Sequence, residues 1–144
     1  MNRLIAEGFG LGRAPVAPGT VASAVALLLG AGLLRLPPPV LWAAILLAGL
    51  GGVAAIRGAG ITGDPGSVVI DEVAGQWVAL LGVPRPAGWG WLVAAFVLFR
   101  AFDILKPGPV GWADRRAGSC GVMGDDVIAG ALAALLLVLA RRVG

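Results

Sequence analysis

The sequence predicts an all-α protein embedded in a membrane, and three observations carry this prediction. First, 58% of the 144 residues are hydrophobic and only 13% are charged, whereas roughly 25% are charged in typical soluble chains. Second, the charges cluster and leave long uncharged spans between them. Third, no segment shows the polar–apolar alternation of a membrane β-barrel strand. We therefore expect an integral membrane bundle of about five helices, some short or partly re-entrant, forming one domain over residues 1–144.

Glycine and proline set the limits of the first two expected helices, because both residues tend to end helices. These helices are expected near residues 20–34 and 40–57, with Thr20 as an N-cap and the turn RLPPPV between them. They lie in uncharged spans, 14–34 and 36–56. Both spans reach the length of about 20 residues that is needed to cross a bilayer core of about 30 Å.

The remaining three helices, expected near residues 71–83, 89–105 and 125–141, are less able to cross a bilayer alone. Each contains an uncharged span of fewer than about 20 residues. An acidic pair opens the first and the last of them. Short, tilted or partly re-entrant helices are therefore expected in this half of the chain.

Antiparallel threading of the five helices brings the acidic side chains together. If the helices run back and forth as hairpins, the loops near residues 57–72 and 106–124 share one end of the bundle with the N-terminus. All eight acidic residues then fall at this end, together with most of the 11 basic residues. The basic excess favours this end as the cytoplasmic side of the membrane.

The residue types that are missing exclude several chemistries. The chain has no histidine, which excludes histidine general bases, phosphohistidine intermediates and most zinc sites. Its single cysteine, Cys120, excludes an internal disulfide. The net charge of +3 is spread among acids rather than gathered in a basic patch, so a nucleic acid is not an expected partner.

Two adjacent acidic pairs are the candidate metal ligands. Asp71-Glu72 and Asp125-Asp126 each precede small residues in the following turn, which allow helices to approach closely. The structural alternative is that these acids cap helices. One cap satisfies one helix, however, and a second carboxylate beside it is repelled unless a cation lies between them. Carboxylates without histidine or cysteine suit Mg²⁺, with Mn²⁺ as the alternative ion.

The segment FRAFDILKPGPVGWADRR adds basic side chains to this site. Arg100 and Lys106 each lie three residues from Asp103, so on a helix they share a face with it. A guanidinium fits phosphate oxygens with two donors, and an ammonium contributes a point charge. Asp114 and Arg115 repeat the acid–base pairing beyond the Pro-Gly-Pro turn. The alternative is a solvated ladder of salt bridges.

Four blocks of the chain together resemble the phosphatidylglycerophosphatase A family: GFGLGRAPVAPGT, DPGSVVIDEVAGQW, FRAFDILKPGPVGWADR and GVMGDDVIAG. The resemblance implies a small membrane enzyme that hydrolyses phosphatidylglycerophosphate to phosphatidylglycerol and phosphate with Mg²⁺. It also implies an active site facing the cytoplasm at the bacterial inner membrane. Carried over by position, the family's acidic set falls on Asp71, Glu72, Asp103, Asp114, Asp125 and Asp126, with Asp64 as a further member. Its basic set falls on Arg100, Lys106 and Arg115.

The combined hypothesis gives each group a role. The expected metal ligands are the paired acids Asp71, Glu72, Asp125 and Asp126. The expected phosphate-binding residues are Arg100, Lys106 and Arg115. Either Asp103 or Asp114 is expected to orient the attacking water, and a phosphoaspartate route stays open. The alternatives are a small cation-coupled transporter and a non-catalytic lipid-binding relative; the sequence leaves the oligomeric state open.

Overall fold

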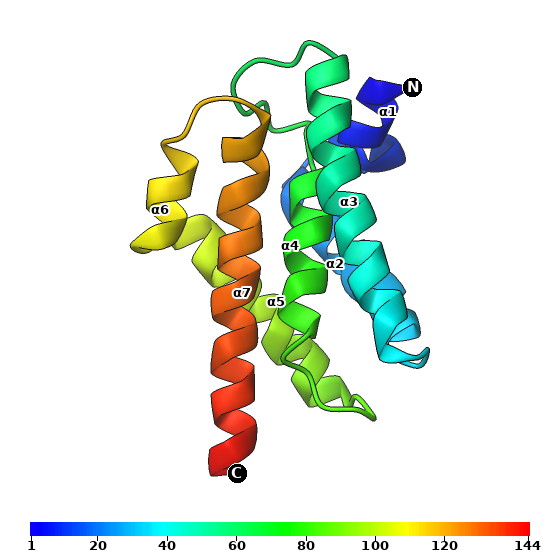
Figure 1. The fold of residues 1–144 in the computed structure, drawn as a ribbon, viewed down its shortest axis with the longest axis vertical. Coiled ribbons are helices and arrows are strands. Elements are labelled where there is room, and N and C mark those ends of the chain that lie inside the picture. Colours follow the sequence, from blue (N-terminus) through cyan, green and yellow to red (C-terminus); the bar gives the residue numbers. More distant parts are fainter.

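The computed structural model describes all 144 residues and confirms the all-α fold, with seven α-helices, one 3₁₀ helix and no strand (Figure 1). In chain order the elements are α1 (Asn2–Ala6), η1 (Gly8–Arg13), α2 (Pro18–Leu33), α3 (Pro38–Gly58), α4 (Ile70–Leu80), α5 (Trp89–Leu105), α6 (Pro109–Asp114) and α7 (Ser119–Val143).

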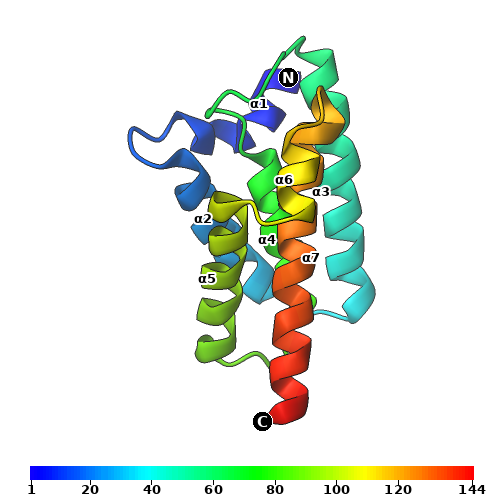
Figure 2. The same ribbon diagram turned by 90° about the vertical axis from the view of Figure 1, so that its left-hand side faces the viewer.

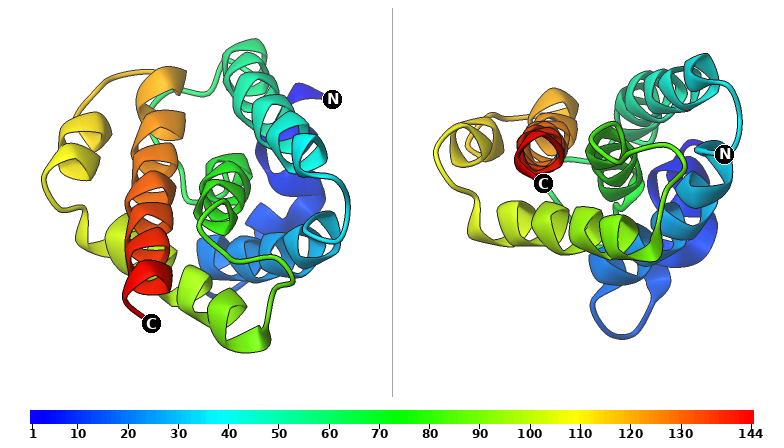
Figure 3. Two further views of the ribbon diagram at one scale, coloured as in Figure 1. Left: turned by 60° about the horizontal axis from the view of Figure 1, so that its bottom comes forward. Right: turned by 90° about the horizontal axis from the view of Figure 1, so that it is seen from below.

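Helix α4 occupies the centre of the bundle, and α2, α3, α5 and α7 all contact it (Figure 3). It is buried on nearly every side, which suits a short helix in the interior rather than on the surface. Two apolar clusters hold it in place. One includes Leu80, Phe99 and Leu137, and the other includes Ile56 and Met123. The position of α4 is therefore fixed by packing against four neighbours.

Glycines allow α4 and α7 to pack backbone against backbone, as the small residues in the sequence predict. A Cβ added to Gly75 would lie 2.6 Å from the carbonyl oxygen of Asp126, closer than real Cβ contacts occur. A Cβ added to Gly130 would overlap the carbonyl oxygen of Gly75. This close approach brings the first turn of α4 beside the turn of α7 that carries Asp126.

The starts of two helices differ from the sequence prediction, and three short helices are additional to it. Helix α7 begins at Ser119 with Gly118 as its N-cap, so the expected start at Asp125 is wrong, and the alternative that Asp125 or Asp126 caps this helix is excluded. Both lie in its second turn. Gly121, which suggests a loop, instead lies inside this continuous helix, where it packs against the carbonyl of Arg116. Helix α2 begins at Pro18, so Thr20 is not its N-cap. The short helices α1, η1 and α6 were not expected from the sequence.

Two helices are long and apolar enough to cross a membrane. Helices α3 and α7 have 21 and 25 residues, and both reach a mean hydropathy of 2.1 over an 18-residue window. Leu47 and Leu50 of α3 are exposed, as lipid-facing side chains would be. Helix α2 is apolar but has only 16 residues, about 24 Å at 1.5 Å per residue, which is shorter than a bilayer core of about 30 Å.

Candidate metal and phosphate site

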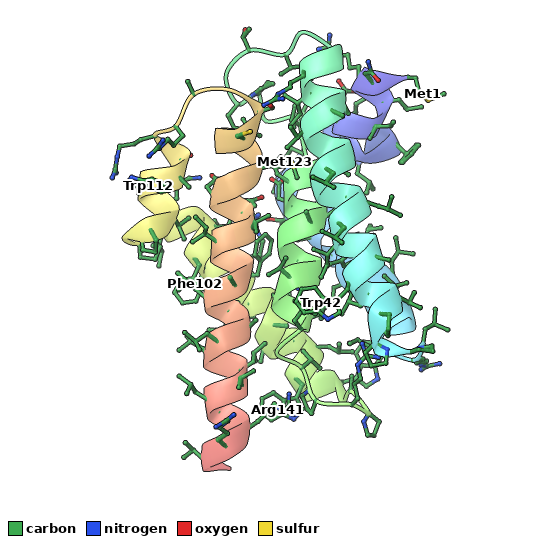
Figure 4. The ribbon with its side chains drawn as sticks, in the orientation of Figure 1. Met1, Trp42, Phe102, Trp112, Met123 and Arg141 are labelled. Carbon is green, nitrogen blue, oxygen red and sulfur yellow. The ribbon has the colours of Figure 1, made fainter.

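The elements that carry the candidate site residues lie toward one end of the bundle. The N-terminus, the loop between α3 and α4 and the start of α7 gather there, while the C-terminus lies at the other end (Figure 2). The first turn of α4 and the last turn of α5 also point toward this end. Side-chain oxygens gather between α7 and α4 near the labelled Met123 (Figure 4).

Three carboxylates from α4 and α7 form a group that fits a cation. Ligand atoms of Asp71, Glu72 and Asp126 all lie within 4.8 Å of one another. A second group of the same size consists of Asp103, Asp125 and Asp126. Asp126 belongs to both groups, so the two possible cation positions are adjacent. The predicted convergence of the acids is thus present in the fold, with Asp103 included.

Asp71, Glu72 and Asp126 lack the partners that buried charges need. Oδ1 of Asp71, Oε2 of Glu72 and Oδ2 of Asp126 are buried without a hydrogen-bond partner, and no ion pair involves any of the three residues. An unpaired buried carboxylate costs several kcal/mol. A divalent cation bound by these three residues would supply the missing counter-charge, and an all-oxygen donor set fits a hard ion. The residues present therefore fit a metal site.

Arg100 forms the ion pair with Asp103 that their spacing predicts, three residues apart on α5. Both side chains are mostly buried, and Nε of Arg100 has no hydrogen-bond partner. Arg100 also borders α2, because a Cβ added to Gly19 would lie 3.4 Å from its Nη1. The guanidinium therefore lies between Asp103 of α5 and the first turn of α2, with a donor still free.

Lys106 links α5 to α6 and α7 rather than to Asp103. Its Nζ lies 2.6 Å from Oδ2 of Asp125 and 2.9 Å from Oδ1 of Asp114. Burial by itself lowers the pKa of Lys106, but the hydrogen bonds to Asp125 and Asp114 outweigh it and raise the pKa above its usual value. The hydrogen bond from Lys106 likewise lowers the pKa of Asp114. Lys106 thus remains charged and balances Asp125.

Three of the sequence-predicted residues lie at the rim of the site. The Asp114 side chain is 37% exposed, and Asp114 belongs to neither cation group. Arg115 ends α6, is exposed, and forms no ion pair. Asp64 lies in the loop between α3 and α4, and together with Asp114 it lines a cavity of about 180 Å³. The predicted set therefore divides into a buried inner group and an exposed rim.

Two residues at the site were not singled out from the sequence. Gly19 packs against the Glu72 carboxylate, since a Cβ there would overlap Oε1 of Glu72. The available signal was its place in the Pro-Gly-Thr block before an apolar run. Gln76 is fully buried on α4, one turn after Glu72, and its amide has no hydrogen-bond partner. The available signal was an uncharged polar residue four positions after an acid in an otherwise apolar helix.

Comparison with known proteins gives a family. The family model described as phosphatidylglycerophosphatase A matches residues 4–141. Phosphatidylglycerophosphatase A of Escherichia coli is 37% identical, with 93% of this chain and 80% of that protein covered. The protein of the same name from Haemophilus influenzae is 39% identical, with 95% and 86% covered.

A third relative carries a different name. The putative phosphatidylinositol-3-phosphatase of Bacteroides thetaiotaomicron is 41% identical, with 97% of this chain and 93% of that protein covered. No solved structure matches the chain. The chain therefore belongs to the phosphatidylglycerophosphatase A family, and this membership indicates an enzyme with phosphatidylglycerophosphatase activity.

Proposed function

We propose that this chain is a cation-dependent phosphatase of phospholipid synthesis that hydrolyses phosphatidylglycerophosphate to phosphatidylglycerol and phosphate. Residues 1–144 act as one catalytic domain. The observation that carries the proposal is the group of three buried, unpaired carboxylates on α4 and α7, in a chain of the phosphatidylglycerophosphatase A family. Such a group fits a divalent cation, and a phosphate ester is the substrate class that this chemistry serves.

Mg²⁺ is the proposed ion, and Mn²⁺ is its substitute. Asp71, Glu72 and Asp126 are the proposed inner ligands, and Asp125 with Asp103 provides the adjacent set. When bound, the ion supplies positive charge beside the phosphoryl oxygens and lowers the pKa of a bound water. The donor set contains only oxygen, which is the set that Mg²⁺ and Mn²⁺ prefer.

The basic residues bind the terminal phosphate. Arg100 presents a planar guanidinium beside the inner acids, suited to two phosphate oxygens at once. Lys106 holds Asp125 and contributes a second positive charge. Arg115, exposed at the rim, completes the phosphate contacts as the lipid headgroup enters. Each of these roles follows from charge and position, and each can be tested by substitution.

Asp103 is better suited than Asp114 to orient the attacking water. Asp103 belongs to one of the cation groups, whereas Asp114 is engaged by Lys106 at the rim, and this contact lowers its pKa. Loss of Asp103 should therefore reduce turnover more than loss of Asp114.

The proposed location is the bacterial inner membrane with the site facing the cytoplasm. Helices α3 and α7 are long and apolar enough to cross a membrane, which supports a location in the membrane. The excess of basic residues at the acidic end of the bundle supports the cytoplasmic orientation. A lipid substrate could then reach the site from the bilayer while phosphate leaves to water.

A second substrate is suggested by the relative named as a putative phosphatidylinositol-3-phosphatase. Both lipids carry a phosphate monoester at the membrane surface, so the same acids and bases suit either. The test measures phosphate release by the purified chain in detergent micelles with Mg²⁺ on each lipid, with Asp126→Asn as the matched inactive control. We expect higher kcat/KM for phosphatidylglycerophosphate. Faster phosphate release from the inositol lipid would make that lipid the preferred substrate. No release from either lipid would contradict the proposed phosphatase activity.

A further inference from the structure

Gln76 is a buried polar residue that the proposed chemistry does not use. Its side chain is fully buried on α4, and neither Nε2 nor Oε1 has a hydrogen-bond partner. An amide buried without partners costs roughly 1–3 kcal/mol on protein mutational scales. A methionine or leucine at this position would remove that cost. A glutamine here therefore indicates a partner that is not a protein group.

The surroundings of Gln76 indicate what that partner is. Residues four apart on a helix lie on one face, and long helical side chains lean toward the N-terminal turn, so the Gln76 amide leans toward Glu72. All buried side-chain polar atoms without a partner in the chain belong to this one region. They are Oδ1 of Asp71, Oε2 of Glu72, both amide atoms of Gln76, Nε of Arg100 and Oδ2 of Asp126.

These atoms are complementary in kind. The carboxylate oxygens of Glu72 and Asp126 accept hydrogen bonds, Nε of Arg100 donates one, and the amide of Gln76 does both. None of them reaches another directly. Buried water joins such groups when two to four polar partners surround it. An amide is the neutral side chain that can connect an acid on one side with a guanidinium on the other.

We propose that Gln76 is a positioning residue of the metal site. Through buried water, its Nε2–H group donates toward the Glu72 carboxylate, and its Oε1 accepts from Nε–H of Arg100. This holds Glu72 in the orientation that binds the cation and keeps Arg100 aimed at the phosphate. The inference rests on the proposed function, because it needs the acids of α4 and α7 to bind a cation. A glutamate at position 76 would instead add charge to carboxylates that are already unpaired.

The test compares Gln76→Met with Leu80→Met. Leu80 is fully buried one turn further along the same helix and lies outside the site. Mn²⁺ binding is measured by electron paramagnetic resonance on the purified chain without lipid, and the melting temperature is measured without cation. Outer-sphere partners of metal ligands are worth 10- to 100-fold in affinity. We expect Gln76→Met to weaken Mn²⁺ binding by roughly this factor with an equal or higher melting temperature, and Leu80→Met to bind Mn²⁺ normally.

Each other outcome has a defined meaning. If Gln76→Met binds Mn²⁺ as tightly as the wild type, the positioning role is wrong while the proposed function stands. If Gln76→Met melts well below the wild type without cation, Gln76 has a structural partner and the proposal is also wrong. If the wild type itself binds no Mn²⁺, the metal site fails, and this inference fails with it.

Discussion

The contact between α4 and α7 makes the substitution Gly75→Ala informative. The new Cβ would lie 2.5 Å from Cε2 of Phe99, whose ring must move, and 2.6 Å from the carbonyl oxygen of Asp126, which is 0.8 Å inside the 3.4 Å at which ordinary contact begins. The two helices must therefore separate by close to an ångström at the level of the acids. Overpacking of this kind costs about 1–3 kcal/mol, and the better helix propensity of alanine returns up to about 1 kcal/mol. We expect a net loss of stability of about 0–3 kcal/mol.

The effect on turnover should be larger than the effect on stability. The shift separates the ligands on α4 from Asp126, and a misplacement of about 1 Å can cost about 100-fold in rate. The assay is the initial rate of phosphate release in micelles with Mg²⁺, accompanied by the melting temperature. The matched control is Gly82→Ala, in the turn that follows α4, whose Cβ would overlap the carbonyl oxygen of Ala134 on α7. Eight residues of α7 separate Asp126 from Ala134, about 12 Å along the helix.

The control variant should lose stability but keep most of its turnover. If Gly75→Ala hydrolyses the lipid at the wild-type rate, the spacing of α4 and α7 does not set the site geometry. If Gly82→Ala is equally inactive, the loss reflects a general loosening of the helix pair and not the acidic cluster. Either result would contradict the claim that the spacing of α4 and α7 at the acidic residues sets the rate of turnover.

The remaining predictions concern charge and backbone. Lys106→Gln should lower the free energy of unfolding by about 1–3 kcal/mol near neutral pH, because the nearly buried Asp125 carboxylate loses its hydrogen-bond partner. The Lys106 contact also lowers the pKa of Asp114 below its usual 3.8. The stability that this contact contributes is therefore fully present above pH 3.8 and is lost as the pH falls through the pKa of Asp114 in the folded protein. Melting temperatures measured across pH should show the wild type and Lys106→Gln becoming more alike in acid. Asp126→Asn should abolish phosphate release yet leave expression and the cation-free melting temperature intact or higher, since it removes one of several crowded charges; a loss of folding would contradict this. Gly51→Ala, on an open face of α3, should raise the free energy of unfolding by up to about 1 kcal/mol with unchanged turnover. A fall in stability or in turnover would contradict the open space that the fold shows at Gly51.

Much of the site could be predicted because it depends on residue types and on short spacings within single helices. Asp71 and Glu72 begin a short apolar helix, and small residues one turn later allow α7 to approach. The Arg100–Asp103 pair follows from a spacing of three on a helix. Residue type, helical period and residue size were enough for these features.

The parts that were missed have both local and tertiary causes. Gly121 by itself indicates a loop, yet it lies inside α7. A glycine is needed there because the carbonyl of Arg116 occupies the space that a side chain would take. Pro109 indicates an irregular turn, although proline is favoured in the first turn of a helix such as α6. Lys106 contacts Asp125, 19 positions away, instead of Asp103. Which partner an ammonium selects is set by the tertiary fold and not by local spacing.

The most direct test of the account is the cation dependence of phosphatidylglycerophosphate hydrolysis by the purified chain. Phosphate release is followed while a chelator removes divalent ions, and Mg²⁺ is then added back in excess. Because buried oxygens of Asp71, Glu72 and Asp126 have no partner in the protein, we expect release to stop with the chelator and to return with Mg²⁺. Turnover that continues unchanged in the chelator would contradict it.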